Sequence, residues 1–556
     1  MASVARRVRR RRQLEGWKSL PWKNIQKSVF RLQKRIYQAA SKNEVKRVHD
    51  LQRLLLRSWS ARCLAVRRVT QDNRGKRTAG VDGLASLTPH QRMRMVGDLR
   101  NLTVHTPAPL RRVYIPKPGK KEMRGLSIPT MFDRALQALV KLALEPEWEA
   151  RFEPNSYGFR PGRSPHDAIG SIFNFVRLKP KYALDADITQ CFDRISHDVI
   201  LDKLHTIQPI ERLVRGWLKA GILDHGEMIF PEAGTAQGGP LSPLLANVAL
   251  HGLETAVCEA APSKAQPGVI RFADDVVILH HDLDTLHHLQ SVAAEWLAGI
   301  GLELHPEKTF ISHTLEPYNG QAGFDFLGFH IRQYPVGKHR TRTYRGQPGF
   351  KTFIKPSRKA LQRQRDKLRD IIQHHRGAPQ SALVYVLNPV IQGWANYYQY
   401  CVAKHDFQIL DNVLYHQLVR WARYRHPRKS GKWCYHHYWR EVNGRVRFSD
   451  GESVLSFYQT TAVTRFVKVQ GHKSPYDGDW VYWSTRLGRD PSKPRRVTRL
   501  LKRQRGCCAL CGLRCTTEDV IEVHHYDGNH NNNAFDNLRL MHGHCHDIVH
   551  GSRCLR

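Results

Sequence analysis

The sequence predicts a multidomain α+β protein, and three features of its 556 residues support this. Apolar residues recur at helical spacing near the N-terminus and again over residues 357–425. Between them, from about residue 100 to 335, short apolar strands alternate with helical runs, as in a mixed α/β domain. The last fifty residues are rich in Cys and His and are predicted to be a separate small unit. A chain of this length has room for several hydrophobic cores.

The elements outside the α/β region follow from periodicity and from its interruptions. Residues 23–67 are predicted to be helical, and RGKRTAGVDG (74–83) ends them as a Gly-rich loop. A further helical stretch, 357–425, contains LNPVIQGWANYY (387–398), and KPRRVTRLLKRQRG (493–506) is predicted to be a basic linker. The residues that set the helical period are Ile25, Val29, Leu32, Ile36, Val45, Val48, Leu51, Leu55, Leu361, Leu368 and Ile372.

The charge balance is the strongest compositional signal. Lys and Arg number 88 against 49 Asp and Glu, a formal net charge of +39. An excess this large favours a polyanionic partner, and nucleic acid is the leading interpretation. The basic N-terminus, MASVARRVRRRR, is not followed by an apolar stretch and is predicted to be a disordered arm. No run of about 18 apolar residues occurs, so no transmembrane helix and no membrane partner are expected.

Two acidic segments predict a divalent-metal site. VIRFADDVVIL (269–279) indicates a β-hairpin with Asp274 and Asp275 at its tip. KYALDADITQCFDRISHD (181–198) places Asp187 at the end of a short strand, while Asp185 and Asp193 are competing candidates in the same segment. Mg²⁺ takes carboxylate oxygens, and two ions about 3.5–4 Å apart suit phosphoryl transfer to a 3′-hydroxyl. Periodicity alone does not choose between Asp185 and Asp187, because both lie on one face of a strand.

The C-terminal Cys and His residues predict a structural zinc site. Six of the 11 Cys fall between Cys507 and Cys554, which favours metal binding over disulfides in a chain without a secretion signal. Two knuckles of two ligands each are expected to hold Zn²⁺. Cys507 or Cys515 is an alternative for one ligand. The predicted ligands are Cys508, Cys511, His542 and Cys545.

Residues 78–335 resemble the reverse transcriptase domain of group II intron-encoded proteins, through a series of motifs in the family's order. The motifs are TAGVDG (78–83), RRVYIPKPGKKEMRGLSIPT (111–130), FDRALQALVKLALEP (132–146), SYGFRPGRSPHDAI (156–169), DADITQCFDRISHD (185–198), GTAQGGPLSPLLANVAL (234–250), RFADDVVIL (271–279), GLELHPEKT (301–309) and FDFLGF (324–329). The resemblance implies a right-hand polymerase with fingers, palm and an α-helical thumb. Phe272 stands where the family usually has Tyr, which leaves the metal ligands unchanged.

The resemblance also implies residue roles. Asp187, Asp274 and Asp275 would be the catalytic carboxylates that hold Mg²⁺, in preference to Asp185 or Asp193. SYGFRPGR would support the primer–template, although its Arg160 and Arg163 are equally suited to bracing the fold. The expected nucleotide-binding residues are Arg111, Lys117, Arg124, Phe192 and Gln237.

Residues after 350 resemble the later domains of the same family. LNPVIQGWANYY marks a thumb or maturase domain, and WCYHHYW and SPYDGDWVYWSTR mark a DNA-binding region. Trp394, Tyr397 and Tyr398 are expected to be core residues. VHHYDG, NAFDNLRL and CHDIVH occur in the order of an HNH endonuclease with a ββα-metal fold. By that resemblance His525 is the general base, His524, His546 and His550 hold Mg²⁺ or a similar divalent ion, and Asn537 supports the turn; a purely structural zinc finger is the alternative.

The predicted organisation has five parts: a basic N-terminal helical extension (1–77), fingers and palm (78–335), a thumb/maturase domain (336–425), a DNA-binding region and linker (426–500), and an HNH endonuclease with structural zinc (501–556). The resemblance implies an RNA-directed DNA polymerase that copies a bound group II intron RNA by target-primed reverse transcription, aids splicing and nicks target DNA. Its partners would be intron RNA, double- and single-stranded target DNA and dNTPs, in a bacterial cytoplasm. The alternatives are a splicing-only maturase and a stand-alone endonuclease.

Overall fold

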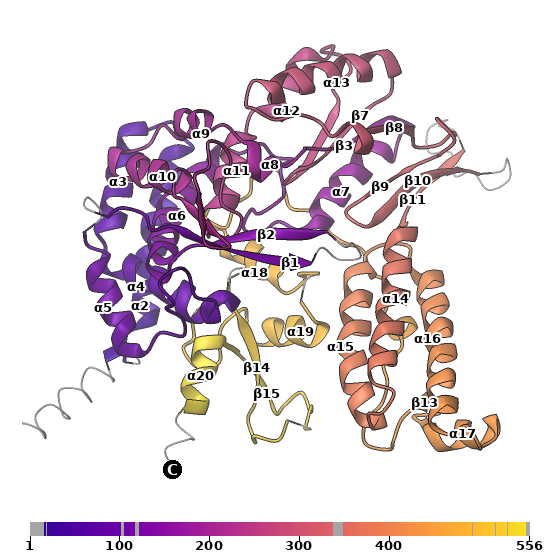
Figure 1. The fold of residues 1–556 in the computed structure, drawn as a ribbon. Coiled ribbons are helices and arrows are strands. Elements are labelled where there is room, and N and C mark those ends of the chain that lie inside the picture. Colours follow the sequence, from indigo (N-terminus) through magenta and orange to yellow (C-terminus); the bar gives the residue numbers. More distant parts are fainter. Residues whose placement is uncertain are drawn as a thin grey trace, which may run out of the picture.

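The computed structural model describes residues 16–17, 19–101, 105–116, 122–336, 349–491, 493–516, 519–530 and 532–551. Among these residues, no helix has both the length and the apolar character needed to cross a membrane. The N-terminal helices and the C-terminal residues lie on the same side of the molecule, and a bundle of long helices projects on the other side (Figure 1).

The N-terminal helices cover a central helix, α6 (Met131–Arg151), which is buried along most of its length. The predicted helical stretch 23–67 is confirmed as three helices, because Ile25, Val29 and Ile36 repeat at the spacing that places them on one buried face. These helices are α2 (Trp22–Ala40), α3 (Val45–Arg57) and α4 (Trp59–Arg67), followed by a π-helical turn (Arg68–Asp72), a 3₁₀ turn (Arg74–Arg77) and α5 (Pro89–Asp98).

The first sheet has the strand order β2-β1-β4-β5. Strands β1 and β2 pair antiparallel, and β4 adds parallel to β1. Several apolar side chains at the ends of these strands are exposed, so this sheet presents a surface rather than a core. The strands are β1 (Leu110–Pro116), β2 (Met123–Ile128), β4 (Ile222–Asp224) and β5 (Glu227–Ile229).

The second sheet is fully antiparallel, in the order β6-β7-β3-β8. Its inner strands are largely apolar and buried, and the acidic residues lie at the end of β3 and at the start of β7. The sheet strands are β3 (Tyr182–Asp187), β6 (Gly268–Phe272), β7 (Asp275–His280) and β8 (Phe310–His313). The helices of this region are α7 (Pro165–Val176), α8 (Cys191–Arg194), α9 (His197–Leu204), α10 (Gln208–Leu218), α11 (Ser242–Ala249), α12 (Leu253–Ala260) and α13 (Leu283–Ala298).

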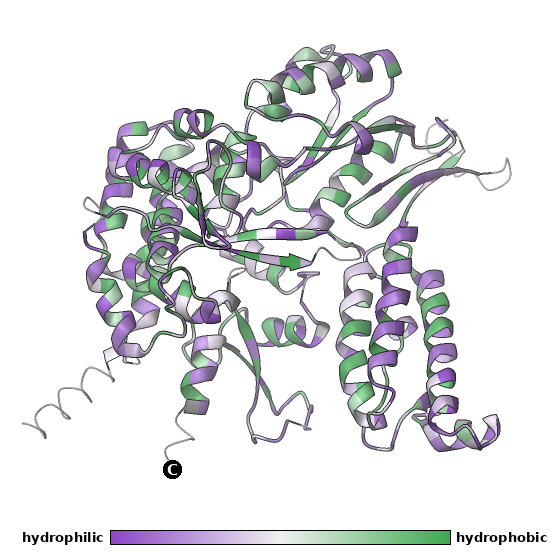
Figure 2. Cartoon of the chain, in the orientation of Figure 1, coloured by the Kyte–Doolittle hydropathy of each residue, from purple (hydrophilic) through white to green (hydrophobic). Residues whose placement is uncertain are grey.

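Three long helices form the bundle, and apolar and polar residues alternate along each of them, as in amphipathic helices (Figure 2). Tyr397 and Tyr398 donate hydrogen bonds to the carbonyls of Leu327 and Gly328, both at 3.1 Å, so the bundle is fastened to the preceding small sheet. The elements are β9 (Phe324–Phe326), β10 (Phe329–Pro335), β11 (Phe350–Pro356), α14 (Arg358–His374), α15 (Gln380–Tyr398), α16 (Lys404–Arg425), α17 (Gly431–Tyr438), β12 (Trp439–Val442) and β13 (Arg445–Phe448).

Residues 350–356 pair with β10 as a sheet strand, ahead of the helical stretch predicted from residue 357. One expectation about an element is wrong. The expected linker 493–506 contains helix α19 (Arg495–Arg503), whose Leu500 and Leu501 are buried. The last fifty residues share a hydrophobic cluster with Leu500 and Leu501 of α19, and their Leu513 packs in the core that contains the N-terminal helices. The remaining elements are α18 (Trp480–Leu487), β14 (Ile521–His525), β15 (Leu538–His542) and α20 (Gly543–Gly551).

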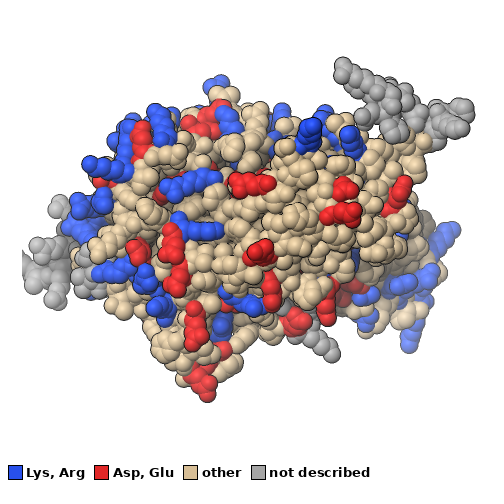
Figure 3. Space-filling view, turned by 90° about the horizontal axis from the view of Figure 1, so that it is seen from above, with Lys and Arg blue, Asp and Glu red and all other residues tan. Residues whose placement is uncertain are grey.

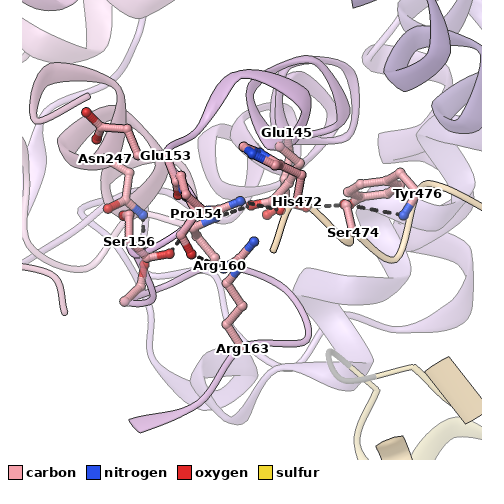
Figure 4. Close-up of polar contacts among 12 residues, drawn as sticks. Glu145, Glu153, Pro154, Ser156, Arg160, Arg163, Asn247, His472, Ser474 and Tyr476 are labelled. Atoms are coloured by element: carbon pink, nitrogen blue, oxygen red, sulfur yellow. Dashed lines mark hydrogen bonds and ion pairs between the residues drawn. The ribbon is translucent and has the colours of Figure 1, made fainter. Parts of the chain in front are cut away.

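The SYGFRPGR segment is held by buried arginines (Figure 4). Arg160 forms a two-pronged ion pair with Glu149, at 2.8 and 3.0 Å, and also donates to the carbonyls of Glu153 and Ser156. Arg163 donates to the carbonyl of Pro154 at 2.8 Å. These contacts support the bracing interpretation of both arginines.

Replacing Arg160 by Met should therefore destabilise the protein by about 3–5 kcal/mol, because the buried Glu149 would lose its countercharge. Urea unfolding followed by tryptophan fluorescence measures this. The matched control is Arg215→Met, whose pair with Glu211 is solvent-exposed and should cost less than about 1 kcal/mol. Equal losses in the two variants would contradict a structural role for Arg160.

Candidate active site and C-terminal metal centre

Three aspartates meet where two neighbouring strands of the second sheet end. Asp187, the last residue of β3, is the register partner of Asp275, the first residue of β7. Asp274 lies in the β6–β7 turn, and its carbonyl accepts a 3.2 Å hydrogen bond from the amide of Ile188. The preceding Ala273 has φ +58°, which makes the turn tight enough to present adjacent carboxylates. The hairpin predicted for this segment is confirmed, with the acidic pair at its tip.

The carboxylates repel one another and are partly withdrawn from water. Burial, then the charges of Asp274 and Asp187, raise the pKa of Asp275 to about 7. Burial and Asp187 also raise the pKa of Asp274, against the opposing charges of Arg124 and Lys308. A divalent cation is the group that would relieve such repulsion.

The three aspartates are not among the sets of side chains whose ligand atoms all lie within 4.8 Å of one another in the described chain. Lys308 instead forms an ion pair with Asp187. Mg²⁺ needs only one or two carboxylates, with phosphate and water completing its shell, so an Mg²⁺ site does not require all three carboxylates in mutual contact.

Lys308 is a site residue that sequence reasoning did not assign. It lies in a 3₁₀ turn (Pro306–Lys308) within the motif GLELHPEKT. The amide of His305 in the same motif donates to the carbonyl of Asp187 at 2.8 Å, which fixes the turn beside β3. The sequence signal that could have identified Lys308 was its position in a family motif that follows the acidic hairpin.

Asp193 has a different partner, and Asp185 lies on the same face of β3 as Asp187, two residues back along the strand. Asp193 accepts two 3.2 Å hydrogen bonds from Gln237, in the glycine-containing loop before α11. Asp185 pairs with Val277, and burial, then Asp275 and Asp325, raise its pKa to about 7. Of the three candidates in this segment, Asp187 is nearest the turn.

The buried Arg271 supports the acidic turn through hydrogen bonds to the turn and to neighbouring segments. Arg271 donates to Asn247 at 3.0 Å, to the carbonyl of Ala273 at 3.3 Å and to Ser156 at 2.8 Å. A Cβ at Gly158 would lie 2.2 Å from the Ala273 amide, so only glycine allows the SYGFRPGR segment to approach this closely. The segment thus acts as a brace for the turn.

The expected nucleotide-binding residues that the structure describes lie on β1, β2, α8 and the loop before α11. Arg111 and Arg124 lie on β1 and β2, and the charge of Arg124 acts on Asp274, whereas Lys117 falls outside the described residues. Phe192 in α8 packs edge-on against Phe159, with 5.8 Å between ring centroids. The carbonyl of Gln237 accepts a 2.7 Å hydrogen bond from Ser127, which joins its loop to β2.

Four C-terminal side chains form a compact cluster of the kind that holds zinc. Ligand atoms of Cys508, Cys511, His542 and Cys545 all lie within 4.8 Å of one another. His542 Nδ1 faces the thiols, 3.3 Å from Cys511 Sγ and 4.0 Å from Cys545 Sγ. Tetrahedral zinc with Zn–S bonds of about 2.3 Å spaces its ligand atoms by roughly 3.8 Å, so the cluster fits this ion. Cys507 and Cys515 are not members of it.

A second cluster lies on the ββα unit formed by β14, β15 and α20. Ligand atoms of His524, His546 and His550 lie within 4.8 Å of one another, and Glu522 pairs with His546 Nδ1 at 2.7 Å. His525, next in β14, is 3.5 Å from Asn533 Oδ1.

Asn537 closes the loop between the two strands of this unit. Its side chain donates to Asp527 Oδ1 and to the carbonyl of Asn532, both at 2.9 Å. The residues expected to form a ββα-metal site are therefore brought together.

Three family models match consecutive parts of the chain. They are the N-terminal domain of reverse transcriptase (residues 17–99), reverse transcriptase (RNA-dependent DNA polymerase) (residues 115–331), and the group II intron, maturase-specific domain (residues 361–439). The chain is thus similar to reverse transcriptases over residues 115–331 and to group II intron maturases over residues 361–439. The acidic sheet and most of the first sheet lie within the part that matches the reverse transcriptase model.

Curated relatives support the same family. The chain is 32% identical over 245 residues to the group II intron-encoded protein LtrA of Lactococcus lactis subsp. cremoris, covering 42% of this chain and 40% of that protein. It is 29% identical to Protein YkfC of Escherichia coli strain K12 (54% and 88% covered) and 25% identical to Maturase-like protein 1 of Euglena gracilis (70% and 78%). The chain thus matches less than half the length of LtrA.

Replacing Asp275 by Asn should stabilise the metal-free protein near neutral pH. The folded-state pKa of about 7 lies above the unfolded value, so the wild type loses stability as pH rises from about 4 to about 7. In EDTA at about pH 7.5, thermal unfolding should show the variant more stable by on the order of 1–2 kcal/mol. The gain should shrink towards pH 5, where the wild-type carboxyl is protonated in the folded state. A variant less stable than wild type at neutral pH would contradict the repulsion.

Proposed function

We propose that this protein is an RNA-directed DNA polymerase that copies a bound group II intron RNA by target-primed reverse transcription. It also assists intron splicing as a maturase and nicks target DNA with its C-terminal module. The observation that carries the proposal is the register that sets Asp187 opposite Asp275 beside Asp274, in a reverse transcriptase domain.

The chain's own residues have separable tasks in copying. Two bound Mg²⁺ ions would activate the 3′-hydroxyl of the primer and steady the triphosphate. Asp187, Asp274 and Asp275 would hold them, and Lys308 would be displaced from Asp187 or would neutralise its charge. Arg124, whose charge already acts on Asp274, is suited to the incoming phosphates, and Arg111 and Lys117 would contact them as well. Phe192 would lie under the sugar and favour deoxynucleotides, and Gln237 would border the template.

The nucleic-acid partners are supported by charge and shape. The face seen in Figure 3 carries acidic side chains among basic ones. The net positive charge of +39 is therefore not spread evenly over the surface of the molecule. A cavity of about 1200 Å³ lies between the SYGFRPGR segment and residues 464–516. Arginines and aromatic rings line it, including Arg465, Phe466 and Tyr482. Such lining suits single-stranded DNA through stacking and phosphate contacts.

The C-terminal module would cleave target DNA. A divalent ion at His524, His546 and His550 would stabilise the charge on the scissile phosphate. His525 would accept the proton of the attacking water. Glu522, bonded to His546, would orient that imidazole, and Asn537 would keep the β14–β15 loop closed.

Primer extension on poly(rA)/oligo(dT) tests the polymerase. Asp187→Asn should lower the rate by about 10³-fold or more, because it removes a shared ligand worth several kcal/mol. The matched controls Asp185→Asn and Asp193→Asn, from the same segment, should retain most activity. Absence of extension by the wild type at saturating Mg²⁺, with intron splicing preserved, would favour the splicing-only maturase.

A reciprocal pair of variants tests the nuclease. His525→Ala should abolish nicking of double-stranded target DNA and leave primer extension within about twofold of wild type, since the base acts only in hydrolysis. Asp187→Asn should do the opposite. Point variants are required because Leu513 packs in the core of the N-terminal helices, so truncation near residue 500 would damage both parts. Nicking retained in His525→Ala would refute the assigned base, whereas a wild type that does not nick would favour a structural zinc finger.

A further inference from the structure

An arginine of the N-terminal region reaches towards the zinc cluster. Arg67, at the end of α4, is 1% exposed and donates from Nε to Asp72 Oδ2 at 3.0 Å. Its Nη2 lies 3.8 Å from Asp519 Oδ1, in the loop between the two zinc knuckles. The guanidinium also stacks over Trp22, 4.9 Å from the ring centroid. A buried arginine of one domain therefore faces a buried carboxylate of another.

Asp519 connects that arginine to a proposed zinc ligand. Asp519 Oδ2 lies 3.5 Å from His542 Nε2, while His542 Nδ1 faces the sulfur atoms. The two nitrogens of the ring thus have different neighbours, the metal-binding cluster on one side and the carboxylate on the other. A carboxylate in this position fixes the orientation and basicity of a metal-bound imidazole.

A second branch starts from the same pair. Asp72 Oδ1 lies 3.6 Å from His544 Nδ1, and His544 Nε2 lies 3.3 Å from Cys545 Sγ. His544 is also within ring contact of Trp22, at 6.1 Å between centroids. Helix α20, which carries His544 and Cys545, begins beside the π-helical turn that carries Asp72 (Figure 1). Arg67 and Asp72 are thus connected to two of the four proposed ligands, to His542 through Asp519 and to Cys545 through His544.

We propose that Arg67 is a positioning residue of the zinc centre, which it stabilises through Asp519 from the polymerase part of the chain. The inference rests on the proposed zinc site. A buried carboxylate needs a countercharge, and Arg67 supplies it for Asp519 as well as for Asp72. The zinc module is then held at one position on the N-terminal helices, and retention of zinc depends on those helices.

The test measures zinc in the full-length protein. Zinc content is determined by elemental analysis, and release into excess EDTA is followed with a chromogenic zinc indicator. Arg67→Met and Asp519→Asn should each release zinc about 10–100-fold faster than wild type. The double variant should release it no faster than the faster single variant, because both changes break one connection.

The control separates this role from general destabilisation. Arg62 is a buried arginine on the same helix, roughly 140° around the axis, and it donates to the carbonyl of Val96 in the N-terminal region. Arg62→Met should lower the unfolding temperature yet release zinc within about twofold of the wild-type rate. Equal release from Arg67→Met and Arg62→Met would overturn the inference while leaving the zinc site intact. Unchanged release from Asp519→Asn, which alters only the module, would overturn it even if Arg67→Met fails to fold. A wild-type protein purified without zinc would refute the zinc site itself.

Discussion

The pairing of β3 with β7 is the constraint on which the rest of the active region depends. Side chains alternate along a strand, so a slip of one residue would send Asp187 to the opposite face of the sheet and away from Asp275. The pairing holds although it brings like charges together, because Leu184, Ala186, Val276 and Ile278 bury apolar surface along the same strands. Apolar packing thus maintains an electrostatically unfavourable site, as is common where charge must meet a cation.

Arginine has two physical roles in this chain, and burial separates them. Arg160 and Arg271 are enclosed, and their donors are taken up by Glu149, by Asn247 and by backbone carbonyls around the acidic turn. Burial lowers the pKa of Arg271 to about 10, which still leaves it charged near neutrality. Arg124 and Arg465 belong instead to surfaces where phosphates could approach. The net charge therefore overstates the number of cations available for nucleic acid.

The sequence predicted the acidic hairpin, the N-terminal helices and the grouping of metal ligands, because each depends on local spacing. The apolar runs on either side of the acidic pair located Asp274 and Asp275 at a hairpin tip, and two short knuckles located the thiols. Resemblance was needed to prefer Asp187 over Asp185, since both share one face of β3. Helix α19 was not predicted because most of its residues are Arg and Lys and its apolar stripe is short. Leu500 and Leu501 are buried only by contacts with distant parts of the chain, which the local sequence does not indicate. Long-range partners such as Lys308 with Asp187 leave no periodic signal.

The position of the C-terminal module follows from the same long-range packing. Leu513, in the loop after the first knuckle, joins the core of the N-terminal helices, and Arg514 lies over Trp480 at 5.2 Å. A metal module linked only by a flexible chain would sample many positions relative to the rest of the fold. Docking through apolar and charged contacts removes that freedom, because both kinds of contact would have to break together. The fold therefore sets the distance between the C-terminal His and Cys clusters and the acidic turn, which suits the proposed combination of nicking and copying.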